Sequence, residues 1–179
     1  MLKSNNPTAL KSQRWIIESL LRMMEEKPYD EISVSEICHK ADLDRRTFYR
    51  NFDSKNDVLE QYVIFLGNEY IRALTNFNTI DGYVATKLFF DFWKQHFRFI
   101  LQLRSSGLAD FAFKRFEAFV TQYRALLAGS NMPGVPDKQL EYIFAYRIGG
   151  LWNAMLLWAE NGAVVSPDEM ANTFMTELS

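Results

Sequence analysis

The 179-residue chain has very few of the side chains that metal and thiol chemistry require, with one cysteine, Cys38, and two histidines. A single cysteine excludes both a disulfide within the chain and a cluster of thiolate metal ligands. The sequence also contains no nucleophile motif, phosphate-binding loop or dinucleotide fingerprint. We therefore expect no enzyme, no metal and no cofactor, and the lone thiol favours a reducing, cytoplasmic location.

Long apolar runs and strand-like alternation are absent too. The longest uncharged apolar run, Ile148 to Ala159, has 12 residues, whereas a membrane-spanning helix needs about 20. The start of the chain has no basic segment followed by an apolar one, so we expect no signal peptide. No stretch alternates apolar and polar residues over a useful length, which predicts an all-α protein.

An excess of positive charge, the usual mark of a nucleic-acid-binding protein, is also missing. The net charge is −2, and the first 60 residues hold 10 Lys and Arg against 11 Asp and Glu. Phosphate binding depends on local charge density more than on the overall balance. From Lys40 to Lys55 there are five basic and three acidic residues, so a prediction of DNA binding rests on the position of these charges.

What the chain does have is a series of helix starts and stops. Thr8 can cap a first helix, which Pro28 ends. Ser33 and Glu36 form a capping box, and Asp44 can cap the next short helix. Further helices are expected from residue 54, over 81–103, 107–128 and 137–161, and from 166, with a turn-rich loop at 129–136. The total is about eight or nine helices.

The short helix after Asp44 is the candidate DNA-reading element. Phe48 and Phe52, four residues apart, should face inward and leave the polar residues outside. Arginine can pair bidentately with guanine, threonine can meet a thymine methyl group, and free amides at a helix start suit a phosphate. The candidates from these arguments are Ser33, Ser35, Arg45, Arg46, Thr47, Arg50 and Asn51. Taken alone, such a charged face is most often simply solvated.

The combined string changes that balance, because it resembles the TetR family of bacterial transcription regulators. The resemblance runs from about Trp15 to Leu59 and is most specific in Thr47-Phe48-Tyr49-Arg50-Asn51-Phe52-Asp53-Ser54-Lys55. It looks closest to the subgroup that resembles regulators of dihydroxyacetone kinase genes. Pro28 and Asp42 stand where the family usually has glycine, and Asp44 where it usually has serine. The resemblance implies phosphate contacts by Tyr49 and Lys55.

The region after residue 78 is unusually aromatic. Residues 77–123 hold 13 of the 27 aromatic side chains, more than one packing face needs. For any single residue, ordinary core or a protein interface is the simpler interpretation. The resemblance implies an apolar effector pocket, with these candidates: Phe89, Phe92, Trp93, His96, Phe97, Phe116, Phe119 and Tyr123.

The last two expected helices are candidates for self-association. Gly149-Gly150 interrupts an otherwise strong helix, and each glycine costs about 1 kcal/mol relative to alanine there. Close approach of another helix would explain that cost, although packing within the chain is the alternative. The candidate interface residues are Ile143, Tyr146, Gly150, Ala154, Trp158, Met170 and Phe174.

These features together predict a helix-turn-helix DNA-binding domain at 1–53 and a helical ligand-binding and dimerisation domain at 54–179. The resemblance implies a homodimeric regulator, more often a repressor, on palindromic double-stranded DNA. Control could come from a small apolar effector bound by the second domain. The alternative is control by a partner protein, with no small-molecule pocket.

Overall fold

The computed structural model describes residues 6–77, 81–123 and 136–177. Over these ranges it consists of nine α-helices and one short 3-10 turn, with no strand. The all-α class predicted from the sequence is therefore confirmed. None of the helices in these ranges is both long and apolar enough to cross a membrane.

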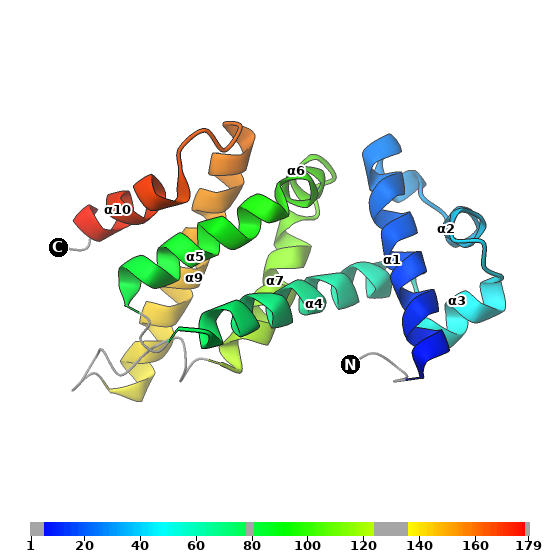
Figure 1. Ribbon diagram of the computed structural model, residues 1–179, viewed down its shortest axis with the longest axis horizontal. Coiled ribbons are helices and arrows are strands. Elements are labelled where there is room, and N and C mark those ends of the chain that lie inside the picture. The colour runs from blue at the N-terminus through cyan, green and yellow to red at the C-terminus, as the bar shows by residue number, and fades with distance from the viewer. Residues whose placement is uncertain (1–5, 78–80, 124–135, 178–179) are drawn as a thin grey trace.

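The first three helices form a small head at one end of the molecule (Figure 1). They are α1 (Pro7–Glu26), α2 (Val34–Lys40) and α3 (Arg45–Asn51), with the 3-10 turn η1 (Tyr29–Glu31) between α1 and α2. Helix α1 packs on both α2 and α3. Ile16, Phe48 and Phe52 are fully buried in this core, as the inward placement of the two phenylalanines required.

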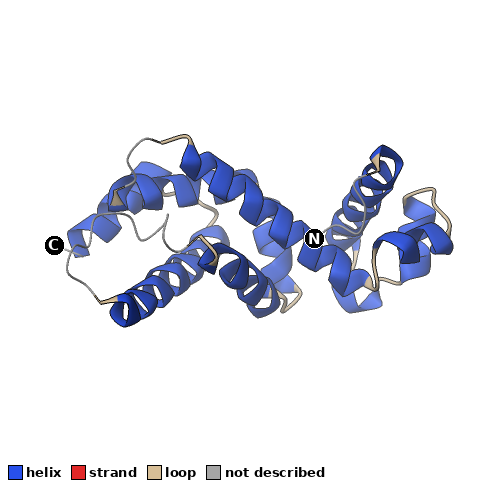
Figure 2. Cartoon of the chain, turned by 90° about the horizontal axis from the view of Figure 1, so that it is seen from below, coloured by secondary structure: helices blue, strands red, loops and turns tan. Residues whose placement is uncertain are grey.

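Helix α4 (Lys55–Thr75) leaves the head and runs into the body, as Figures 1 and 2 both show. The body adds α5 (Gly82–Gln95), α6 (Phe97–Ser105), α7 (Ala109–Thr121), α9 (Asp137–Glu160) and α10 (Pro167–Glu177). Helix α4 contacts α1 in the head and α7 and α5 in the body, and α10 packs along α5. One continuous helix thus joins the two parts.

The helix starts of the head follow local side-chain chemistry. Ser33 accepts a hydrogen bond from the Glu36 amide, and Glu36 accepts one from the Ser33 amide, so the predicted capping box is confirmed. Asp44 accepts a hydrogen bond from the Thr47 amide at 2.6 Å, again as predicted. The expected Thr8 cap is wrong. Asn6 caps α1 by accepting from the Thr8 amide, and Pro7 occupies the first turn, a position that proline favours.

The turn between α2 and α3 depends on Asp42. Its φ of 53° lies in the left-handed region, which aspartate tolerates better than most residues with a side chain. The Leu43 amide then donates to the carbonyl of Cys38 at 3.0 Å. The tight connection of the helix-turn-helix therefore forms without glycine at this position.

The single helix expected over 81–103 is wrong, because the chain breaks at His96 into α5 and α6. No proline or glycine marks the break. Helix α5 buries Phe89 against Tyr70 of α4 and Trp93 between α7 and α9. Helix α6, which packs on α7 and α9, buries Ile100 and Leu103. One straight helix could not bury both sets, so tertiary packing bends the chain there.

The later helices match their expected starts. Helix α9 begins at Asp137, and α10 begins at Pro167 after a capping box of Ser166 and Glu169. Helix α7 ends at Thr121. Its expected extension over 124–128 and all but the last residue of the loop at 129–136 lie outside the described residues.

Candidate functional site

Helix α3 is held with a cationic face towards solvent. The Asp44 cap fixes its start, and buried Phe48 fixes the opposite side against α1. Arg45, Arg46 and Arg50 are all exposed. The predicted outward direction of these three side chains is therefore what the structure shows.

The α3 arginines differ from Lys27 and Lys40, two cations of the head that are paired with glutamates. Lys27 pairs with Glu36 at 2.6 Å, and Lys40 pairs with Glu26. By contrast, Arg45, Arg46 and Arg50 have no salt-bridge partner within the described part of the chain. A head whose formal charges nearly cancel thus still presents one uncompensated positive surface.

Tyr49 shapes this surface. It is 46% exposed, its ring meets the edge of Phe48, and the Arg45 guanidinium lies 5.9 Å from its centroid. A hydrogen bond with Tyr49 also raises the pKa of Arg45. Tyr49 therefore lies exposed beside Arg45 on the cationic face of α3 and helps to orient that guanidinium.

The predicted outward direction of the Asn51 side chain is wrong. We expected it to point outward, but it is only 7% exposed, and its side-chain amide donates to the Thr47 carbonyl at 2.8 Å. Asn51 follows the buried Phe48 by three residues, and that spacing places both on one helical face. The side chain is occupied inside the head and is not available for a base edge.

Lys55 is also engaged within the head. Its ammonium donates to the backbone carbonyls of Tyr29, Asp30 and Ile32, at 2.7, 3.2 and 3.0 Å. An ammonium has three N–H donors, so these bonds use all of them. The resemblance implied a phosphate contact for Lys55, whereas the geometry makes it a clamp between the start of α4 and the turn before α2.

The two serines at the start of α2 differ. The Ser33 hydroxyl is occupied by the capping box, donating to Glu36 at 2.7 Å, while Ser35 is exposed. The hydrogen bonds from Lys27 and then from Ser33 lower the pKa of Glu36 to about 2. Glu36 therefore keeps its negative charge at neutral pH. Of the two serines, Ser35 is exposed and has a side chain that the capping box does not use.

A groove between the start of α1 and α3, of about 550 Å³, adds residues that the sequence interpretation missed. Lys11 and Trp15 line it from α1, opposite Thr47 and Arg50 from α3. The Lys11 ammonium lies 4.7 Å from the centroid of the Trp15 ring. A Lys-x-x-x-Trp spacing on one helical face was the available signal, and it extends the cationic surface beyond α3.

Among the residues that the structure describes, the eight expected pocket residues line neither the groove beside α3 nor the cavity of the body. They lie in or against an aromatic core in which Trp93 contacts Phe89, Phe116 and Trp152 with centroids 5.4 to 6.2 Å apart. Such distances are typical of packed aromatic pairs. Burial of His96 beside Phe92 and Trp93 lowers its pKa. The ordinary-core interpretation is the one that the structure supports.

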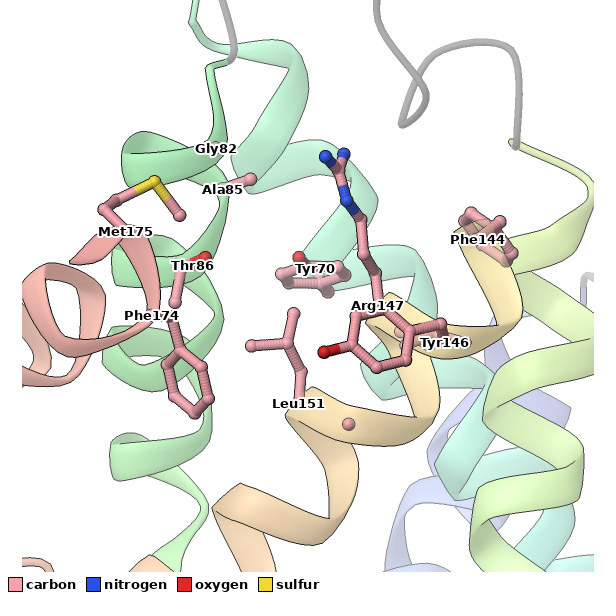
Figure 3. Close-up of a pocket in the computed structure, with 12 residues that line it drawn as sticks. Tyr70, Gly82, Ala85, Thr86, Phe144, Tyr146, Arg147, Leu151, Phe174 and Met175 are labelled. Atoms are coloured by element: carbon pink, nitrogen blue, oxygen red, sulfur yellow. The ribbon is translucent and has the colours of Figure 1, made fainter. Parts of the chain in front are cut away.

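A cavity of about 170 Å³ does exist in the body, but elsewhere. It is bounded by α4, α5, α9 and α10, and Figure 3 shows Tyr70, Thr86 and Arg147 around it. None of the eight expected residues lines it. One signal was available: Arg147 is the single charged residue between Glu141 and Glu160.

Residues 16–62 match the sequence model of bacterial regulatory proteins of the tetR family. By this match, residues 16–62 have a TetR-type sequence. Comparison with curated protein sequences gave no match.

Similarity of fold to solved structures extends over more than 90% of the chain. A TetR-family transcriptional regulator from Syntrophomonas wolfei superimposes with a TM-score of 0.73 and 18% identity, covering 92% of this chain and 91% of that one. The fatty acid degradation regulator FadR from Bacillus halodurans gives 0.68 and 15%, covering 95% and 93%. The dihydroxyacetone kinase operon activator DhaS gives 0.57 and 17%, covering 93% of each chain. At these identities the likeness concerns the fold.

TetR-family regulators bind DNA and form dimers. The exposure of the residues expected at a dimer interface can be compared with that expectation. Tyr142, Tyr146 and Leu157 are 78%, 70% and 58% exposed, and Gly150 is exposed between them. The prediction that Trp158 lies at a dimer interface is wrong, because Trp158 is 4% exposed and its indole nitrogen donates to the Val165 carbonyl. Phe174 is half-buried and stacks on Phe90. Ile143, Ala154 and Met170 are half-buried.

Proposed function

We propose that this protein is a homodimeric transcription repressor whose binding to a palindromic DNA operator is controlled through its C-terminal helices. Residues 1–53 bind the operator, and residues 54–179 dimerise and receive the controlling signal. One observation supports the proposal most: a capped, anchored α3 exposes Arg45, Arg46 and Arg50, and none of the three forms a salt bridge in the described ranges.

The chemistry of that surface supports reading of base edges. Arginine forms paired hydrogen bonds with guanine in the major groove, each such contact giving about 1–3 kcal/mol of discrimination. Arg45 and Arg46 at the start of α3 carry this role, Thr47 meets a thymine methyl group, and Arg50 contacts a base or phosphate. Tyr49, Ser33 and Ser35, with the amides that begin α2, contact the backbone. We leave Asn51 and Lys55 out, because both are occupied inside the head.

Dimerisation through α9 is supported by its glycines. A Cβ added at Gly150 would meet nothing within 4 Å in the described structure, and one at Gly149 would meet only Phe113 at 3.9 Å. Packing within the chain therefore does not require either glycine. Each still costs the helix about 1 kcal/mol relative to alanine. A helix of a second copy, packed against Gly150 between Tyr146 and Ala154, accounts for that cost.

Control through the body is supported by α4. Lys55 at its start is clamped to the turn before α2, and Tyr70 near its end lines the cavity. A molecule that moves Tyr70 therefore acts on the same rigid helix that positions the head. The cavity favours a small molecule over a partner protein as the source of control.

The experiment is a binding titration of the purified protein on DNA flanking its own gene, with unrelated DNA as competitor. We expect specific binding of a dimer to two half-sites about 34–36 Å apart, and interference with transcription from that DNA. Absence of a specific complex at low salt would refute the proposal. A stable complex with another protein that alone changes operator binding would replace the effector by a partner.

A further inference from the structure

The cavity between α4, α5, α9 and α10 is mainly apolar. Its walls include Phe144 and Leu151 from α9 and Phe174 from α10. Figure 3 shows Leu151 and Phe174 beside the space between α5 and α9. Pockets that hold small molecules are typically apolar with a few placed polar groups. The volume of about 170 Å³ suits a short chain or a single ring, and the walls provide an apolar body with a matching surface.

One cation stands at this cavity without an acid to neutralise it. Arg147 lines the cavity, is exposed, and makes no salt bridge within the described residues. No aspartate or glutamate is among the lining residues. An amine would therefore meet a like charge with nothing to offset it, whereas a single carboxylate would complete a charge-assisted pair.

Two hydroxyl groups add direction to the site. Tyr70 is 4% exposed and Thr86 is 6% exposed, and both line the cavity. No hydrogen bond joins either hydroxyl to another group of the described residues, and neither oxygen is among their fully buried unpartnered atoms. Each hydroxyl therefore keeps some accessible surface at the cavity, where a bound polar atom can pair with it. Tyr70 belongs to α4, which connects this group to the head.

We propose that the cavity binds a small apolar monocarboxylic acid. The carboxylate pairs with the guanidinium of Arg147 and accepts from the hydroxyl of Tyr70 or Thr86, while the apolar part lies against Leu151 and Phe174. A dianion is disfavoured because the cavity offers one cation. The role of this acid as effector rests on the proposed function, but its binding does not.

The test uses the full-length protein and calorimetric titration with octanoate, hexanoate and benzoate, alongside the neutral analogue octanol. We expect at least one acid to bind with a Kd below about 1 mM, and more tightly than octanol. Arg147→Gln should weaken that acid about tenfold or more and leave octanol unchanged. Arg98→Gln is the matched control, because Arg98 is also exposed but lies on α6, outside the cavity.

The outcomes separate cleanly. Binding of none of the acids, or equal weakening by Arg147→Gln and Arg98→Gln, would overturn the inference. Gly150, against which the proposed second copy packs, also lines the cavity, so absence of binding would mean that the dimer leaves no room for a ligand there. Operator binding by the ligand-free protein is measured in parallel. Loss of operator binding together with normal acid binding would refute the proposed function but not the carboxylate site. Normal operator binding without acid binding would refute only the carboxylate site.

Discussion

The ammonium of Lys55 lies 4.5 Å from the centroid of the Tyr29 ring and donates a 2.7 Å hydrogen bond to the Tyr29 backbone carbonyl. Together with the bonds to Asp30 and Ile32, this contact ties the first turn of α4 to the turn that precedes α2. The orientation of the head on α4 therefore depends on a lysine that looks, from the sequence, like a phosphate contact.

Replacing Lys55 separates these two roles. Lys55→Met should lower the free energy of unfolding by about 2 kcal/mol, because a half-buried cation and its charge-assisted bonds are lost. Denaturant titration measures the change. A residue that only contacts phosphate would instead leave stability intact and reduce the salt dependence of DNA binding by about one charge. Unchanged stability would therefore contradict the clamp.

The capping box of α2 predicts a pH dependence. The pKa of Glu36 is lowered to about 2 by hydrogen bonds from Lys27 and Ser33, so its stabilising effect is complete above the ordinary glutamate pKa. It is lost as the pH falls through the folded value near 2. Thermal unfolding of the wild type against Glu36→Gln should show a difference that is constant at neutral pH and shrinks below about pH 4. A difference that persists unchanged at pH 2 would exclude this role.

Gly149 and Gly150 form a matched pair for the dimer. Either alanine should stabilise α9 by up to about 1 kcal/mol, since neither Cβ would clash within the chain. Gly150→Ala should in addition weaken dimerisation by about 1–3 kcal/mol through overpacking, whereas Gly149→Ala should not. Sedimentation equilibrium gives the dimer constants. Equal dimerisation of both variants would mean that Gly150 does not meet a second copy.

Gly67 on α4 supports the close packing of α7. A Cβ at Gly67 would lie 2.5 Å from the Cδ1 atom of Phe119, which is far inside contact distance. Gly67→Ala should therefore destabilise the protein by about 1–3 kcal/mol, despite the better helix propensity of alanine. Phe119→Ala removes the obstacle, so the double variant should lose less than the sum of the two single losses. Strict additivity would show that the ring moves aside at no cost.

The features that sequence could predict are those set by neighbouring residues. The caps at Ser33 and Asp44 and the stop at Pro28 depend on side chains within four positions of the affected backbone. The left-handed turn at Asp42 is equally local. This is why the helix starts and the turn of the helix-turn-helix could be predicted from the sequence, although the net charge of the chain did not favour DNA binding.

The features that sequence missed depend on distant partners. Lys55 bonds to carbonyls 23 to 26 residues away, and no local pattern reveals that. The expected pocket followed the density of aromatic side chains, but those residues pack together around Trp93. The cavity instead forms where α9 and α10 return to α4 and α5, so its position follows from the tertiary arrangement. The burial of Asn51 could have been predicted, because a residue three positions after the inward-facing Phe48 lies on the same face of the helix.

The most direct test of the central claim is operator binding by the double variant Arg45→Ala with Arg46→Ala, against wild type, at one fixed salt concentration. Both arginines are exposed and have no salt-bridge partner in the described residues, so circular dichroism and thermal stability should stay unchanged. The proposal predicts that preference for the operator over unrelated DNA falls by about 1–3 kcal/mol for each lost guanine contact. Lys11→Ala, in the groove beside α3, should weaken binding to all sequences evenly. A folded double variant that keeps its full operator preference would contradict the assignment of α3 as the element that reads DNA.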